Sequence, residues 1–138
     1  MACRPAAAAA LAAGLGLTLL AACAPKPFRI SGSVTLAADL HSRAPRQGAV
    51  LFIVAENLGG VPLAVLRVVD PGFPVNFVLG PEDLLVSGGR PPGPFRLVVK
   101  LSPRSVAGPP ARGDLVGADP DLVYSEGRSA HVVINRRL

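Results

Sequence analysis

The sequence predicts an all-β fold, an antiparallel β-sandwich or partial barrel of about six or seven strands in residues 28–138. Three observations predict it. Apolar and polar residues alternate with a period of two in several short segments, as they do in half-buried strands. Proline and glycine, 15 of each in the chain, cluster between these segments and mark turns. No helical period follows residue 28, and strands without helices pack into sandwiches or barrels.

The first expected strand, residues 28–36, has the clearest alternation. Its apolar residues are Phe28, Ile30, Val34 and Leu36, with arginine, serine and threonine between them. Gly32 falls on the apolar face, where a glycine marks a bulge or the close approach of another backbone. A polar loop, residues 39–48, follows.

The segment 49–55 is apolar at every position and rich in β-branched residues. Such a run predicts a strand that is buried on both faces or lies at the centre of a sheet. Turn residues at 57–60 end it.

Four further strands are expected at residues 63–68, 73–79, 95–101 and 130–135, and the sandwich form of such a fold would be Ig-like. The connections 80–94 and 103–126 are long and rich in proline, which makes them candidates for docking a partner. The first and last strands are the expected sheet edges. The expected core residues are Phe52, Val54, Val65, Phe77 and Val99.

The beginning of the chain has the layout of a secretory signal, with Arg4, an apolar run from Ala6 and small residues before Cys23. We therefore expect a signal peptide at residues 1–22, a short tether at 23–27 and the β domain at 28–138. The alternative is an uncleaved membrane helix, because residues 6–24 are just long enough to span a bilayer.

The end of the apolar run, Leu20-Ala21-Ala22-Cys23, resembles the lipobox of bacterial lipoproteins. The resemblance implies that Cys23 is the lipidation site, receives a diacylglycerol thioether and becomes the first residue of the mature chain. It also implies a location in the bacterial cell envelope, with the membrane as a partner through the N-terminal lipid. Ala24 resembles an outer-membrane sorting signal, and in a diderm source the domain would face the periplasm.

Composition limits the remaining possibilities. Removal of residues 1–22 from 138 leaves one domain of 116 residues, without a disulfide because Cys3 is lost and Cys23 is lipidated. Arg4 is the only charged residue removed, so 13 of the 14 basic residues and all nine acidic ones remain. This excess favours an acidic partner or anionic lipid, but the basic residues are scattered and only one tyrosine is present, which argues against nucleic acid.

The two histidines are weak candidates for a metal or haem contact. His41 lies in the loop 39–48 and His131 on the outward face of the last strand, so they would meet only if the loop folded over that strand. No cysteine remains for such a site and the one methionine is the initiator. We therefore expect no metal and no cofactor.

Candidates for catalysis and ion binding have no recognisable setting, so we do not expect an enzyme. Ser42 and Ser129 are close in sequence to a histidine but not in a nucleophile motif. The acidic pairs have too few ligands for an established calcium loop, and the glycine pair lacks the helix of a phosphate loop. The acidic pairs are Glu82-Asp83 and Asp119/Asp121, and the glycine pair is Gly88-Gly89. Arg112-Gly113-Asp114 is expected to form a tight turn before Leu115.

Six short motifs occur in one order along the domain. They are Ile30-Ser31-Gly32-Ser33-Val34-Thr35-Leu36, Leu51-Phe52-Ile53-Val54-Ala55, Pro62-Leu63-Ala64-Val65, Phe73-Pro74-Val75-Asn76-Phe77, Leu97-Val98-Val99-Lys100-Leu101-Ser102 and Gly113-Asp114-Leu115-Val116-Gly117. Together, over residues 30–134, they resemble the C-terminal periplasmic β domain of the cytochrome c maturation factor of the CcmI (CycH) type. The resemblance implies a β-sandwich that contacts other maturation subunits or an unfolded client. The membrane helices and helical repeats that precede this domain in the family have no counterpart here, so the helix-binding groove is not implied.

These observations lead to one functional expectation and one alternative. We expect a membrane-anchored envelope lipoprotein that acts as a non-enzymatic protein-binding module for an envelope protein or a cytochrome c maturation subunit. The alternative is a structural envelope lipoprotein with no role in haem handling.

The lipobox makes a direct prediction. The variant Cys23→Ser should remain a full-length precursor that is not labelled by fatty acid, because the acceptor thiol is gone. Mass spectrometry of the wild-type chain from membranes checks this, and an intact, unmodified N-terminus would contradict it.

Overall fold

The computed structural model describes residues 26–105 and 107–138. The expected signal peptide (1–22), the lipidation site Cys23 and all of the tether except Lys26 and Pro27 lie outside these residues. No helix in the described ranges is long and apolar enough to cross a bilayer.

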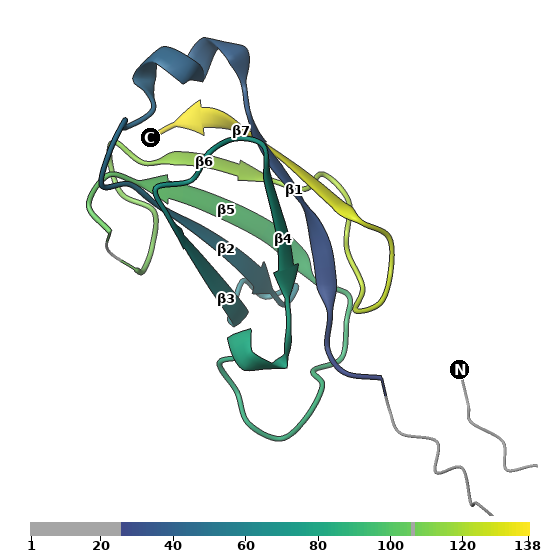
Figure 1. The fold of residues 1–138 in the computed structure, drawn as a ribbon. Coiled ribbons are helices and arrows are strands. Elements are labelled where there is room, and N and C mark those ends of the chain that lie inside the picture. Colours follow the sequence, from purple (N-terminus) through teal and green to yellow (C-terminus); the bar gives the residue numbers. More distant parts are fainter. Residues whose placement is uncertain (1–25, 106) are drawn as a thin grey trace, which may run out of the picture.

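The described chain is nearly all β (Figure 1). The strands are β1 (Ile30–Leu36), β2 (Val50–Glu56), β3 (Pro62–Val69), β4 (Val75–Leu79), β5 (Arg96–Ser102), β6 (Leu115–Ala118) and β7 (Ala130–Arg137). Two short 3₁₀ helices, η1 (Ala38–Arg43) and η2 (Pro81–Asp83), lie in connections.

The seven strands form one sheet in the order β3-β2-β5-β6-β7-β1-β4, which curls into a nearly closed barrel (Figure 1). This confirms the all-β class and the partial barrel. The expectation of a purely antiparallel sheet is wrong, because β1 and β7 are parallel. The expected edges are wrong for the same reason, since the first and last strands pair with each other inside the sheet and β3 and β4 lie at its ends.

The helix η2 connects the two sheet edges. Leu84, directly after η2, forms an isolated bridge with Ala64 of β3, and the amide of Leu85 donates to the carbonyl of Leu63 at 2.8 Å. Because η2 follows β4 immediately, the chain closes part of the gap between β4 and β3.

The core fills the inside of the barrel. Phe77 and Val99 belong to it as expected, and Phe28 and Phe95 pack edge to face with ring centroids 5.6 Å apart. Alternation in β5 and β7 is also as expected, with Leu97, Leu101, Val132 and Ile134 inside.

Three of the expected core residues lie on the opposite face of the sheet. In β2, Leu51, Ile53 and Ala55 face the core, so Phe52 and Val54 face outward. Phe52 is nevertheless buried, whereas Val54 and Val65 are half-buried and were assigned to the core wrongly. The reason is that β2 lies between β3 and β5 and is apolar on both faces, as expected for a central strand, so polarity does not mark its inner face.

Gly32 has the role that its place on the apolar face indicated. A Cβ atom at this position would collide with the backbone oxygen of Ala130 across the β1–β7 pair. Gly117 of β6 likewise faces the backbone of Val133 on β7. Both glycines allow strands next to β7 to approach closely.

The strand β6 and both 3₁₀ helices differ from the sequence prediction, which left these segments irregular. The strand has four residues and begins directly after a turn at Gly113. Its residues, Leu-Val-Gly-Ala, contain no polar alternation, so it is defined by pairing with β5 and β7 rather than by its own pattern.

Strand directions separate the connections into two ends of the barrel. One end carries residues 26–29 and the connections 57–61, 80–95 and 119–129; we call it the tether end, and it is the lower end in Figure 1. The opposite end, which we call the far end, carries η1 and the connections 70–74 and 103–114.

The core assignment predicts the effect of removing one ring. Phe77→Ala should lower the free energy of unfolding by about 3–5 kcal/mol, because it leaves a cavity in the barrel interior. The neighbouring Asn76 is exposed, so Asn76→Ala serves as the matched control and should change stability little. Urea denaturation of both variants checks this, and equal midpoints would contradict the assignment.

Candidate functional site

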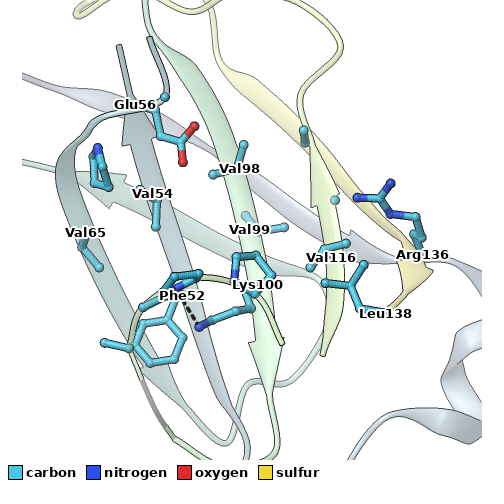
Figure 2. Close-up of a pocket in the computed structure, with 18 of the residues that line it drawn as sticks. Phe52, Val54, Glu56, Val65, Val98, Val99, Lys100, Val116, Arg136 and Leu138 are labelled. Carbon is cyan, nitrogen blue, oxygen red and sulfur yellow. Dashed lines mark hydrogen bonds between the residues drawn. The ribbon is translucent and has the colours of Figure 1, made fainter. Parts of the chain in front are cut away.

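An apolar groove of about 1050 Å³ lies on the outer face of the sheet, over β2, β5 and β6. Figure 2 shows Val54 and Val98 in its middle, with Glu56 at one end and Phe52 and Lys100 at the other. The even-numbered residues of β2 and β5 face outward because the odd-numbered ones fill the barrel, so the groove floor follows directly from the strand register.

The register places cations and apolar side chains alternately across the sheet. Phe52 pairs with Arg67 of β3 on one side and with Lys100 of β5 on the other. Lys100 then pairs with Val116 of β6, which in turn pairs with Arg136 of β7. We call these five residues the basic row.

Phe52 lies between two cations of the basic row. The Lys100 ammonium is 4.9 Å and the Arg67 guanidinium carbon 5.6 Å from the centroid of its ring. Both distances are within the range in which a cation is attracted to the face of an aromatic ring. Cation–π contacts with the Phe52 ring therefore position the Arg67 guanidinium and the Lys100 ammonium on the outer face of the sheet.

The connection 103–114 forms the wall at this end of the groove. The Lys100 ammonium donates to the carbonyl oxygen of Gly108 at 2.9 Å (Figure 2), and the Ser105 hydroxyl donates to the carbonyl of Gly48 at 3.1 Å. Residues 107–110 line the groove. This part of the connection is thus bound to the sheet, which its proline content alone did not indicate.

Glu56 marks the other end of the groove. Burial raises the pKa of its carboxyl group above the ordinary value, and the charge of Arg96, which pairs with it across β5, acts in the opposite direction. The outer face carries four basic side chains and Glu56, so its net charge is positive. The four are Arg67, Arg96, Lys100 and Arg136.

The histidines are not brought into one site. His41 is exposed in η1 at the far end, whereas His131 pairs with Ser33 in β1, and its Nδ1 is 3.0 Å from the Ser33 hydroxyl. This exposed serine–histidine pair was not expected, because only the β1–β7 pairing brings the two residues together. Neither residue lines the groove.

Ser42 and Ser129 are exposed and lie in different connections, Ser42 in η1 and Ser129 just before β7. One member of each acidic pair, Asp83 and Asp119, accepts hydrogen bonds that hold the local structure. Asp83 accepts a hydrogen bond from the amide of Gly80 at 2.8 Å and so caps η2. No group of three or more metal-ligating side chains is present within residues 26–105 and 107–138.

Asp119 holds the connection 119–129 to β7. Its carboxylate accepts two hydrogen bonds from Arg128, at 3.0 and 2.9 Å, and one each from the amides of Asp121 and His131. Burial alone would raise the pKa of Asp119, but these donors outweigh it and hold the pKa below its ordinary value of 3.8.

The Arg112-Gly113-Asp114 segment forms the turn before Leu115 that the sequence indicated. Gly113 has a φ of 95°, and the buried Asp114 carboxylate accepts a hydrogen bond from the amide of Ala111 at 2.7 Å. Arg104 lies 3.9 Å from the same carboxylate. The aspartate therefore supports the wall of the groove.

Comparison with known proteins adds no family to this description. No protein-family model, no curated protein and no solved structure matches the chain.

The low pKa of Asp119 predicts a pH dependence. Because its pKa is lower in the folded chain than in the unfolded one, the stabilisation is present above the ordinary value and is lost as the pH falls through the folded pKa. Arg128 is 42% exposed, so solvent screening limits the effect to about 1 kcal/mol.

Between about pH 5 and about pH 2, Asp119→Asn should therefore lose less stability than the wild type by roughly this amount. Thermal unfolding at both pH values measures the difference, with the exposed Asp39→Asn as control. A loss as large in Asp119→Asn as in the wild type would contradict the role of this carboxylate.

Proposed function

We propose that this chain is a membrane-anchored envelope lipoprotein whose β domain is a non-enzymatic protein-binding module. Anchoring is through a lipid on Cys23, in the outer membrane and facing the periplasm if the source is a diderm bacterium. The groove over β2, β5 and β6 is the binding site. Its partner is an envelope protein that presents an apolar segment flanked by acidic residues.

The observation that carries the proposal is the combination of an apolar floor with the basic row. Val54, Val65 and Val98 are half-buried on the groove face, so a partner that covers them gains apolar burial. Arg67 and Arg136 are exposed at the two ends of the basic row, and the buried Lys100 lies between them against the Phe52 ring and the Gly108 carbonyl. Carboxylates beside the partner's apolar residues would complement these charges and orient the segment.

A binding role is also supported by the chemistry of the lining. The groove is lined mainly by aliphatic residues, and Lys100 is already engaged with the Gly108 carbonyl and the Phe52 ring. The Ser33–His131 pair lies outside the groove.

Cytochrome c maturation is the narrower form of this proposal. Its support is the residue resemblance over 30–134 alone, and the departures noted above remain. A structural envelope lipoprotein without a role in haem handling is the alternative.

Photo-crosslinking tests the groove in membranes that contain the full chain. A crosslinking amino acid at Val98, in the groove, should capture a partner segment that contains an apolar run with adjacent Asp or Glu, identified by mass spectrometry. A synthetic peptide of that segment should then bind the variant Val98→Asp at least about ten-fold more weakly than the wild type, because a carboxylate is placed in the apolar floor.

Val78 of β4 provides the matched control, since it is 47% exposed and lies outside the groove. Crosslinks from Val78 should not include the same segment, and Val78→Asp should bind the peptide as the wild type does. Identical crosslinks from both positions, or equal affinity of Val98→Asp, would contradict the proposed site.

A further inference from the structure

Exposed apolar side chains gather at the tether end of the barrel. Nine large apolar residues are exposed within the described chain, and six of them lie in the three connections at this end. These six, which we call the tether-end cluster, are 41–58% exposed: Leu58, Val61, Leu85, Val86, Leu122 and Tyr124. Among the described residues, the far-end connections contribute none of the nine. Val69 and Leu138 lie at the far end, but Val69 is the last residue of β3 and Leu138 the last residue of the chain.

The backbone holds these side chains outward. In the first connection, the Asn57 side chain accepts hydrogen bonds from the amides of Gly59 and Val61, both at 2.9 Å, and so fixes the turn that carries Leu58. In the second, the hydrogen bond from Leu85 to Leu63 fixes the segment after η2 against β3. The cluster is therefore presented by ordered turns.

The third connection is fixed to the second. Phe95 and Val123 form an isolated antiparallel bridge, and a side chain at Gly93 would contact the ring of Tyr124. Tyr124 thus lies beside the connection 80–95 that carries Leu85 and Val86.

Residues 26–29 enter the barrel within the same surface. Lys26 and Pro27 line a second pocket of about 700 Å³ together with Leu85 and Val86. Both terminal nitrogens of Arg90 lie 3.4 Å from backbone oxygens, one of Lys26 and one of Ser125. Three connections and the start of the described chain therefore form one continuous end face.

With Cys23 lipidated, the position of this face points to a bilayer as its partner. Four residues, 24–27, lie between Cys23 and the buried Phe28, so five Cα–Cα steps join the two and span at most roughly 18 Å. A lipid on Cys23 would therefore hold the tether end within that distance of the membrane surface. Apolar side chains at that depth, with a tyrosine among them, suit the boundary between headgroups and acyl chains.

Positive and negative charges at this end nearly balance, so attraction to anionic headgroups would contribute little to membrane contact. The residues of the end face include Lys26, Arg29, Arg90 and Arg128 but also five carboxylates, in Glu82, Asp83, Asp119, Asp121 and Glu126. The positive charge of the domain lies instead on the strands of the groove face. Apolar burial, rather than attraction to anionic headgroups, would hold the tether end in the bilayer.

We propose that the tether-end cluster inserts into the lipid bilayer and fixes the orientation of the domain, with the far end directed away from the membrane. This inference rests on the proposed anchoring at Cys23, but it concerns how the domain sits once anchored. The long connection 80–94, which the sequence offered as a partner-docking loop, is then a membrane contact. Leu85 lines both the groove and the second pocket, so it lies where the two surfaces meet.

Site-directed fluorescence on the full chain tests the insertion. Single cysteines are introduced as Leu85→Cys or Val69→Cys, labelled with an environment-sensitive dye, and the membrane-purified protein is reconstituted into vesicles of phosphatidylethanolamine and phosphatidylglycerol at about 3:1. The chain without an added cysteine corrects for labelling of Cys3 or Cys23. Val69 is 65% exposed at the far end and is the matched control.

The dye at Leu85 should shift to shorter wavelength and be quenched by lipids that carry a quencher on the acyl chain, whereas the dye at Val69 should not respond. A third labelling site, Tyr124→Cys, reports on the rest of the cluster. When Leu85→Ser and Val86→Ser are added to this protein, quenching of the dye at position 124 should fall by at least half. A dye at Leu85 that responds no more than the dye at Val69 would overturn the inference, and so would a response unaffected by the serines.

Mass spectrometry of the same preparation reports on Cys23 separately. An unmodified Cys23 would contradict the anchoring while the quenching result would still decide whether the cluster enters the bilayer.

Discussion

The parallel pairing of β1 with β7 determines the arrangement of the whole sheet. It places the first and last strands side by side in the interior of the sheet, so the ends of the sheet order fall on β3 and β4. The pairing depends on Gly32, because any side chain there would collide with the backbone of Ala130. This order leaves β3 and β4 at the two ends, where the bridge after η2 joins them, and it sets β2, β5 and β6 side by side under the groove.

The outer face of the sheet has a covered region and an open region. At the far end the connection 103–114 covers the sheet, and Phe52, Lys100 and Val116 are buried there although they face away from the barrel interior. Nearer the tether end the same face is open, and Val54, Val65 and Val98 are only half-buried. The groove floor belongs to the open region and its wall to the covered one, so the covering segment both stabilises the sheet and bounds the candidate site.

The sequence predicted the parts of the fold that are encoded locally. Alternation located β1, β4, β5 and β7 and their inner faces correctly, and the position of Gly32 indicated the close backbone approach. Alternation could not assign the inner face of β2, because its residues are apolar on both faces. Strand order, the parallel pair and β6 depend on contacts between distant residues, such as Gly32 with Ala130, and no short pattern encodes them. The groove escaped prediction for the same reason, because its basic row is assembled from five strands.

The junction of the two terminal strands also constrains how the chain acquires its structure. Residues 32 and 130 are neighbours in the sheet, so the N-terminal strand emerges first from the ribosome but obtains this neighbour only when the last strand has been made. Contacts of such long sequence separation slow the formation of the native state, since a large loop must close before they contribute. Until then one edge of β1 is unpaired, and an unpaired edge is where strands of separate chains associate. The edge of β1 that later pairs with β7 is therefore a site at which separate chains can associate until β7 has been made.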